Sequence, residues 1–228
     1  MKFIIGNWKM NGTKADKKDM IKALKTVKSG NKIVLCLPFT LLCGENKGIS
    51  IGAQDVSSHE NGAYTGDISA TMLKEMGVEY VIVGHSERRT NHDETNEIVR
   101  KKATMAIKNG IVPIVCVGET MEEKNAGHTT SVIKKMLLES IPDNGEYIVA
   151  YEPRWAIGTG QTPTTNEIVS AVKTVFETLP NPMPIIYGGS VNKDNARDII
   201  SIPYVDGLLI GGASLKSDTF LPIIKSID

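Results

Sequence analysis

The residues best suited to chemistry in this chain are Glu152, His85 and Lys9. Glu152 follows an apolar run typical of a buried strand, and Pro153 ends that strand because proline has no N–H for the ladder. The segment Gly158-Thr159-Gly160 comes soon after and can present backbone N–H groups to an anion. A carboxylate at a strand end beside a closable glycine-rich loop suits proton abstraction from a phosphorylated substrate.

Eight short β-rich segments must position these residues. They are nearly continuous in apolar residues, which is typical of strands covered on both faces of a parallel sheet. The segments are 2–6, 32–37, 49–53, 80–84, 112–117, 147–151, 184–188 and 206–210. Helical patterns lie between most of them and at the end, over 16–28, 95–109, 129–138, 165–179 and 217–226. The alternation predicts an α/β fold in which eight parallel strands close into a barrel, with residues 1–228 forming one domain.

An open doubly wound sheet is the alternative fold. It would require a G-x-G-x-x-G turn after the first strand. The chain instead has Asn7-Trp8-Lys9-Met10-Asn11-Gly12 there, so the closed barrel is favoured.

The chemistry of a parallel α/β barrel sits at the carboxyl ends of its strands. We therefore expect polar residues from distant parts of the sequence to converge there. One cation, one histidine, one acid and two glycine-rich turns follow the predicted strands, as Asn7, Lys9, His85, Glu152, Gly188-Gly189-Ser190 and Gly211-Gly212-Ala213-Ser214.

The composition argues against several kinds of partner. The chain has 26 basic and 26 acidic residues, so no net positive field is available to hold nucleic acid. No apolar stretch reaches membrane-spanning length, and the first residues lack a secretory pattern. Three cysteines without C-x-x-C spacing and four scattered histidines predict reduced thiols, no metal site and a cytoplasmic location.

Seven motifs in this chain resemble those of the triosephosphate isomerases. They cover nearly the whole sequence in the order that the family has them. The motifs are Asn7-Trp8-Lys9-Met10-Asn11-Gly12, Gly62-Ala63-Tyr64-Thr65-Gly66, Val83-Gly84-His85-Ser86-Glu87-Arg88-Arg89, Cys116-Val117-Gly118-Glu119-Thr120, residues 151–160, Tyr187-Gly188-Gly189-Ser190-Val191 and Gly211-Gly212-Ala213-Ser214-Leu215.

The resemblance implies a TIM-barrel aldose–ketose isomerase that needs no cofactor. Its members interconvert dihydroxyacetone phosphate and glyceraldehyde 3-phosphate through an enediol(ate), in glycolysis and gluconeogenesis. Deprotonating a carbon next to a carbonyl requires a base and donors for the developing oxyanion.

The resemblance, rather than residue spacing, assigns the individual roles. It makes Glu152 the base and His85 the group that polarises the carbonyl. Lys9 would supply positive charge for the phosphate and the oxyanion, and Asn7 would either orient Lys9 or donate to a substrate oxygen. The phosphate would bind backbone N–H groups of the set Gly158, Ser190, Gly211 and Gly212.

Other features follow from the same resemblance. The loop 60–67 is expected to insert into a second copy of the chain near the residues after strand one, forming a homodimer. Glu87, Arg88 and Glu119 are expected to support the site residues, and Cys116 to be a buried core thiol.

Three positions depart from the family pattern. Only residues 41–48 separate the second strand segment from the third, so we expect a shortened second helix. Arg154 lies in the leading hinge of the glycine-rich lid, where its charge must reach solvent or a carboxylate. Pro163 ends the trailing hinge and lacks the N–H that would bond the Tyr187 hydroxyl on closure, so we expect that latch to be absent.

Two alternative functions remain open at this point. A different phosphate-binding barrel isomerase is one, because a fold does not fix a function. A binding or scaffold protein that kept the barrel and lost turnover is the other. The complete set of Lys9, His85 and Glu152 argues against both, and a coupled assay of glyceraldehyde 3-phosphate isomerisation would discriminate.

Overall fold

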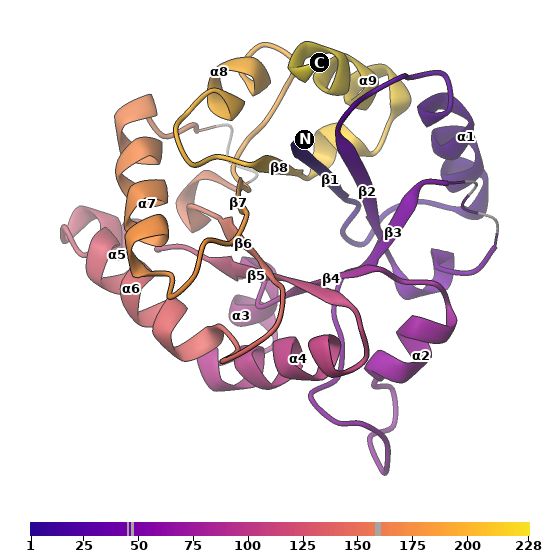
Figure 1. Ribbon diagram of the computed structural model, residues 1–228, viewed down its shortest axis with the longest axis horizontal. Coiled ribbons are helices and arrows are strands. Elements are labelled where there is room, and N and C mark those ends of the chain that lie inside the picture. Colours follow the sequence, from indigo (N-terminus) through magenta and orange to yellow (C-terminus); the bar gives the residue numbers. More distant parts are fainter. Residues whose placement is uncertain (45, 47, 158–160) are drawn as a thin grey trace.

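The computed structural model describes residues 1–44, 46, 48–157 and 161–228, whose strands form a closed parallel barrel (Figure 1). Each strand pairs with the next one in the sequence, and β8 returns to pair with β1. The strands are β1 Phe3–Asn7, β2 Lys32–Leu37, β3 Ser50–Ala53, β4 Tyr80–Val83, β5 Val112–Val117, β6 Ile148–Tyr151, β7 Ile185–Tyr187 and β8 Gly207–Ile210. The prediction of a closed barrel is confirmed.

Both faces of the barrel wall are buried, because alternate strand residues point inward and outward. One face fills the interior with Ile5, Val34, Cys36, Ile82, Ile114, Cys116, Ile148, Ala150, Ile186 and Leu209. The other packs against the helices and includes Ile4, Leu35 and Val115, all fully buried. This double burial explains why the strands appear in the sequence as continuous apolar runs.

The helices surround the barrel in chain order (Figure 1). They are α1 Lys14–Leu24, α2 Ala70–Glu75, α3 Ser86–Asn91, α4 Asn96–Lys108, α5 Met121–Asn125, α6 Thr129–Ser140, α7 Thr165–Thr178, α8 Ala196–Ile200 and α9 Ser217–Ile227. The five predicted helices are present. Helices α2, α5 and α8 were not predicted, because they are too short to show a helical period.

The connection between β2 and β3 is a loop that begins with a single 3-10 turn, η1 (Phe39–Leu41). Within the described residues no α-helix lies between these strands, so the expected shortening of the second helix is confirmed. Figure 1 shows this connection running beside α1. As a result, one flank of α1 has no neighbouring helix.

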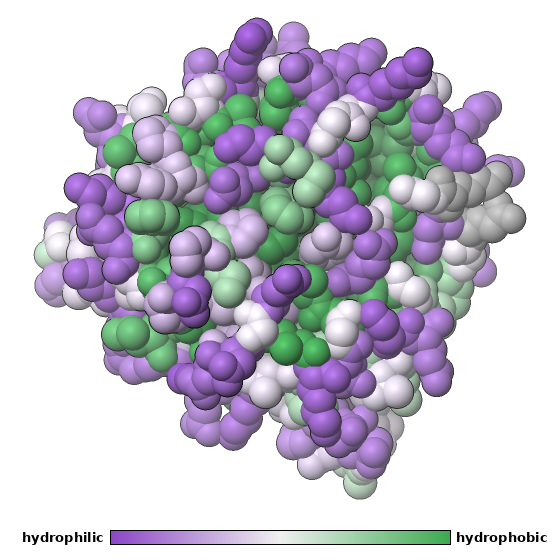
Figure 2. All heavy atoms as spheres, viewed as in Figure 1, coloured by the Kyte–Doolittle hydropathy of each residue, from purple (hydrophilic) through white to green (hydrophobic). Residues whose placement is uncertain are grey.

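The loop between β3 and α2 projects away from the barrel (Figure 1). Residues 59–67 are all exposed, although the rings of His59 and Tyr64 stack with their centroids 3.8 Å apart. Hydrophilic side chains are spread over the face shown in Figure 2, with smaller apolar areas between them. Within the described ranges, none of the helices has the length and apolar character needed to span a bilayer.

Candidate active site

The carboxyl ends of the strands enclose a pocket of about 230 Å³. Its walls bring together seven of the residues singled out in the sequence, namely Asn7, Lys9, His85, Glu152, Ser190, Gly211 and Gly212. They come from the ends of β1, β4, β6, β7 and β8. The eighth, Gly158, lies outside the described residues.

Glu152 is a buried carboxylate in which one oxygen accepts a hydrogen bond and the other has no partner among the described residues. The backbone N–H of Ser86 donates to Oε2 over 3.3 Å. Oε1 has no hydrogen-bond partner among the described residues, and it lies 3.3 Å from His85 Nε2. With only 2% of its surface exposed, this carboxylate has little water around it, which suits a group that accepts a proton from a bound molecule.

His85 has a defined protonation pattern because it caps α3. The backbone N–H of Glu87 donates to His85 Nδ1 over 3.2 Å, so Nδ1 carries no proton. The Glu87 carboxylate is further away, with Oε2 at 3.7 Å from Nδ1. The ring therefore presents its Nε2–H to the pocket, from the N-terminal end of α3.

Lys9 is held in a fixed position by its neighbours. Its φ of 51° places it in the left-handed region, and its backbone N–H donates to Asn7 Oδ1 over 3.0 Å. Its ammonium group pairs with Glu87 Oε1 at 2.5 Å. Asn7 was expected either to orient Lys9 or to donate to a substrate oxygen. Its hydrogen bond with the Lys9 backbone corresponds to the first of these roles.

Two contacts fix the loops on either side of Glu152. An added Cβ on Gly118 would lie 1.8 Å from the Glu152 carbonyl oxygen, so the β5 loop touches the Glu152 backbone directly. An added Cβ on Gly188 would lie 2.8 Å from Glu152 Cγ. The sequence analysis did not use either glycine in this way, although both belong to motifs that it quoted.

The leading hinge of the lid is attached at several points. Trp155 Nε1 donates to the buried Glu119 carboxylate over 2.9 Å, and Lys124 Nζ lies 3.5 Å from the centre of the Trp155 ring. Ser190 Oγ donates to the Ala156 carbonyl over 2.9 Å. Lid residues and a predicted phosphate-binding residue are therefore in direct contact.

Arg154 agrees with the expectation that its charge must reach solvent or a carboxylate, because the residue remains partly exposed. Its guanidinium donates to Thr90 Oγ1 on α3 over 2.6 Å, and the residue is half-buried. It thus ties the hinge to α3 through a hydroxyl group, and no ion pair with a described carboxylate is present at this position.

The Tyr187 hydroxyl is buried and has no hydrogen-bond partner among the described residues. Burial, followed by the negative charge of Glu119, raises the pKa of this hydroxyl well above its usual range. Pro163 is also buried and offers no N–H. The hydroxyl would pair on lid closure only if another donor or acceptor moved to it.

The supporting residues form a charged cluster beside the pocket. Arg88 bonds to Asp55 Oδ2 at 2.9 Å and to Glu94 Oε1 at 2.5 Å. Lys102 contacts the same two carboxylates. The Cys116 thiol is buried, and burial together with nearby Glu152 raises its pKa, so it stays protonated.

Further pocket residues were not predicted as site residues. Ile157, Val191, Asn192 and Leu209 line the same space. Leu209 points into the barrel interior, and the inward alternation along the last strand was the signal that could have identified it.

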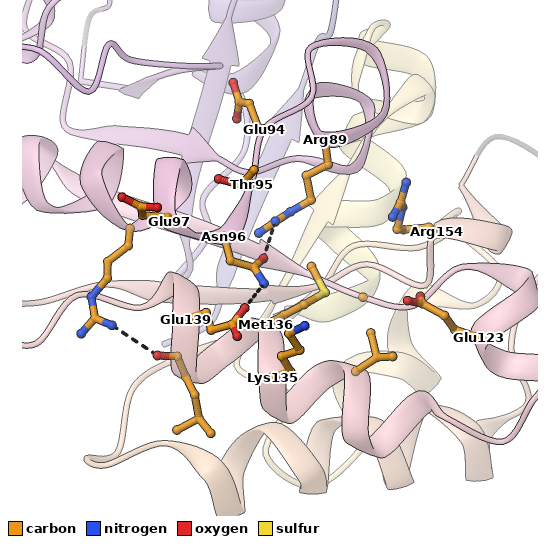
Figure 3. A pocket seen from close by; sticks show the side chains of 14 residues that line it. Arg89, Glu94, Thr95, Asn96, Glu97, Glu123, Lys135, Met136, Glu139 and Arg154 are labelled. Carbon is orange, nitrogen blue, oxygen red and sulfur yellow. Dashed lines mark hydrogen bonds between the residues drawn. The ribbon is translucent and has the colours of Figure 1, made fainter.

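A larger hollow of about 840 Å³ lies on the outer flank, between α4 and α6 (Figure 3). Arg154 and Glu123 stand at one end of it and Glu97 at the other. Several of its polar groups bond to one another, since Arg89 donates to Asn96 and Asn96 donates to Glu139. Within the described residues, no group of three or more His, Cys, Asp or Glu side chains could hold a metal ion.

Comparisons with known proteins agree on one family. Residues 2–227 match the family model for triosephosphate isomerase. The triosephosphate isomerase of Gluconacetobacter diazotrophicus is 43% identical, with 98% of this chain and 97% of that protein covered. That of Alkaliphilus oremlandii is 44% identical over 97% of this chain and 98% of its own. The crystal structure of triosephosphate isomerase from Bartonella henselae superposes with a TM-score of 0.88 at 37% identity, covering 99% of this chain and 98% of that one.

Proposed function

Because this chain belongs to the triosephosphate isomerase family, we propose that the residues lining its pocket divide the work of an enediolate isomerisation. The enzyme interconverts dihydroxyacetone phosphate and D-glyceraldehyde 3-phosphate by proton transfer, a step of glycolysis and gluconeogenesis.

Glu152 is the base that removes a proton from the carbon next to the carbonyl and returns it to the neighbouring carbon. The observation that carries this assignment is its free Oε1, buried and 3.3 Å from His85 Nε2. His85 donates its Nε2–H to the carbonyl oxygen as negative charge develops there.

Lys9 provides positive charge for the phosphate and the oxyanion. Its pairing with Glu87 over 2.5 Å leaves the ammonium group with further N–H donors for a ligand. The contact of Asn7 with the Lys9 backbone supports an orienting role for Asn7. Backbone N–H groups of Ser190, Gly211 and Gly212 bind the phosphate, together with that of Gly158, which lies outside the described residues.

A coupled assay tests these roles. Purified protein should turn over glyceraldehyde 3-phosphate when a dehydrogenase that consumes dihydroxyacetone phosphate is present. Loss of turnover in Glu152 and His85 variants that remain folded would support the assignment. A folded wild-type protein without turnover would favour the scaffold alternative.

We also propose that the chain acts as a homodimer. A hollow of about 420 Å³ shares Asn7, Lys9 and His85 with the pocket and is also lined by Met10 and Phe39. Met10 is 96% exposed, which is unfavourable for a large apolar side chain in a lone subunit. The projecting loop 60–67 of the partner subunit would fill this hollow, with Thr65 of the partner subunit near Asn11 and Lys9.

Sedimentation velocity should show a dimer at nanomolar concentration. Met10→Asp should shift the protein toward monomer and lower its activity, because a charge would be buried in the interface. Met72→Asp is the matched control, since Met72 is also exposed (54%) but lies on α2. A monomer with full activity at the same concentration would contradict the proposal.

The lid of this enzyme closes without a bond from the Tyr187 hydroxyl to the trailing hinge. The unpaired hydroxyl and the missing N–H of Pro163 support this. A phosphate or carboxylate analogue should still bind with the lid closed, through Gly158, but with one bond fewer than a hinge with an N–H would provide.

Tyr187→Phe should therefore change kcat little in the natural background. In Pro163→Ala the same substitution should cost about 0.5–1.5 kcal/mol in kcat/KM, because the alanine N–H restores a partner for the hydroxyl. Steady-state kinetics of the four proteins in this cycle give the coupling directly. A severe defect from Tyr187→Phe alone would show that the hydroxyl has another essential partner.

We propose a cytoplasmic location as well. Cys36, Cys43 and Cys116 are all free thiols, which suits a reducing compartment.

A further inference from the structure

A groove of about 410 Å³ runs along α1 on the flank that faces the β2–β3 connection. We call it the α1 groove, and its lining residues are Lys14, Lys17, Lys18, Ile21, Lys22, Lys25, Leu41, Cys43 and Gly44. More than half of these described lining residues are lysines, and none of them is acidic. In a chain with no net charge, this is a local concentration of positive charge.

The groove exists because no α-helix lies between β2 and β3 among the described residues. On its other flank α1 packs against α9, whereas on this flank the described neighbours that line the groove are Leu41, Cys43 and Gly44. Ile21 and Leu41 form an apolar floor that is closed to solvent, with 5% of each residue exposed. Because these two side chains are already covered within the subunit, the apolar contact that the groove offers comes mainly from the methylene stems of the lysines along its rim.

Four of the lysines form a continuous stripe. Lys14, Lys18, Lys22 and Lys25 are spaced by four, four and three residues, which places them on one side of the helix. At about 1.5 Å per residue the stripe is about 16 Å long. None of the four makes an ion pair with a described residue, so their charges are available to a partner.

The fifth lysine builds the wall of the groove. Lys17 is buried, with 5% exposed, and its Nζ donates to the Cys43 carbonyl over 3.0 Å. This bond holds the loop against α1 while leaving the Cys43 thiol exposed. The groove is thus a fixed feature with an apolar floor and a basic rim.

We propose that the α1 groove binds an acidic amphipathic helix of a partner protein, in the place that the missing second helix leaves open. The apolar face of such a helix would lie in the groove against the methylene stems of the lysines, and its acidic residues would pair with the ammonium groups of the lysine stripe. A stripe about 16 Å long is too extended for a single phosphate group but matches about three turns of helix. The recessed floor also fits a rod better than a flat lipid surface.

Fluorescence anisotropy with the full-length protein tests the proposal. The probe is a labelled 14-residue peptide with leucines on one helical face and glutamates on both sides of it. The control is a peptide of the same composition, scrambled so that it has no apolar face. We expect the amphipathic peptide to bind about tenfold more tightly than the scrambled one, and the affinity to fall as salt is added.

Charge reversal in the protein locates the binding. The double variant Lys18→Glu with Lys22→Glu should weaken binding at least about tenfold, since two attractions become repulsions. The matched control is Lys134→Glu with Lys135→Glu, which makes the same charge change at two exposed lysines of α6. This control should bind like the wild type, and both variants should keep isomerase turnover because neither touches the pocket.

Cys43 gives an independent readout at the groove itself. It is the exposed thiol of the three, because Cys36 and Cys116 are buried, so iodoacetamide should alkylate Cys43 first. The amphipathic peptide should slow this alkylation in the wild type and in the α6 control, but not in the groove variant.

Several results would overturn the proposal. Equal binding of the scrambled peptide, or equal binding by the groove variant, would remove the claim of a selective site. Peptide binding without protection of Cys43 would place the peptide elsewhere. If vesicles of phosphatidylserine and phosphatidylcholine, or tripolyphosphate alone, bind through Lys18 and Lys22 while the peptide does not, the groove recognises a lipid surface or a compact anion instead.

Discussion

Replacing Glu152 by aspartate should lower kcat by about a hundredfold and change KM much less, because a misplacement of about 1 Å at the reacting group has a cost of this size. The substitution withdraws the carboxylate by one methylene. Two contacts define its present position, the bond from the Ser86 N–H and the approach of Oε1 to His85 Nε2. A shortened side chain cannot keep both.

The measurement is steady-state kinetics in both reaction directions with the coupled assay. Glu146→Asp is the matched control, because Glu146 is an exposed glutamate just before the same strand and should tolerate the change. A near-normal kcat in Glu152→Ala would remove the assignment of Glu152 as the base.

Gly118→Ala should be nearly as damaging, although residue 118 carries no side chain that could react. The new Cβ would lie 1.8 Å from the Glu152 carbonyl oxygen and 2.5 Å from its carbonyl carbon, distances that no pair of such atoms tolerates. Backbone must therefore move, and the base moves with it. We expect kcat to fall by about a hundredfold and the free energy of unfolding to fall by about 1–3 kcal/mol.

Thermal unfolding and kinetics of the same preparation separate the two effects. Gly30→Ala provides the control, because an added Cβ there meets nothing within 4 Å. If Gly118→Ala folds and keeps its kcat, the contact between the β5 loop and Glu152 does not position the base.

The sequence could predict the barrel because its strands are buried on both faces. Continuous apolar runs mark such strands, and the predicted bounds of β2 and β5 agree with the structure. The capping box of Thr164 and Glu167 likewise marks the start of α7. Short helices such as α2 and α5 cannot be identified in this way, since six residues or fewer do not complete two turns.

The pocket residues could be named from the sequence because they follow the strands and match family motifs. Their mutual contacts could not, because the partners are far apart in the chain. The contact of Lys9 with Glu87 and the hydrogen bond from the Ser86 N–H to Glu152 form only after the strands have closed into a barrel. The protonated nitrogen of His85 also depends on a backbone N–H whose direction is set by α3.

The short connection between β2 and β3 has a consequence for the folding of the barrel. Val34 of β2 pairs with Ser50, whereas Tyr80 of β4 pairs with Val112, which is about twice as far along the chain. Each halving of a closed loop reduces its entropic cost by about 0.6 kcal/mol. Of these two parallel pairs, β2 and β3 can therefore pair earlier as the chain collapses. The part of the barrel wall that lacks an outer helix thus has the lower entropic cost of strand pairing of the two.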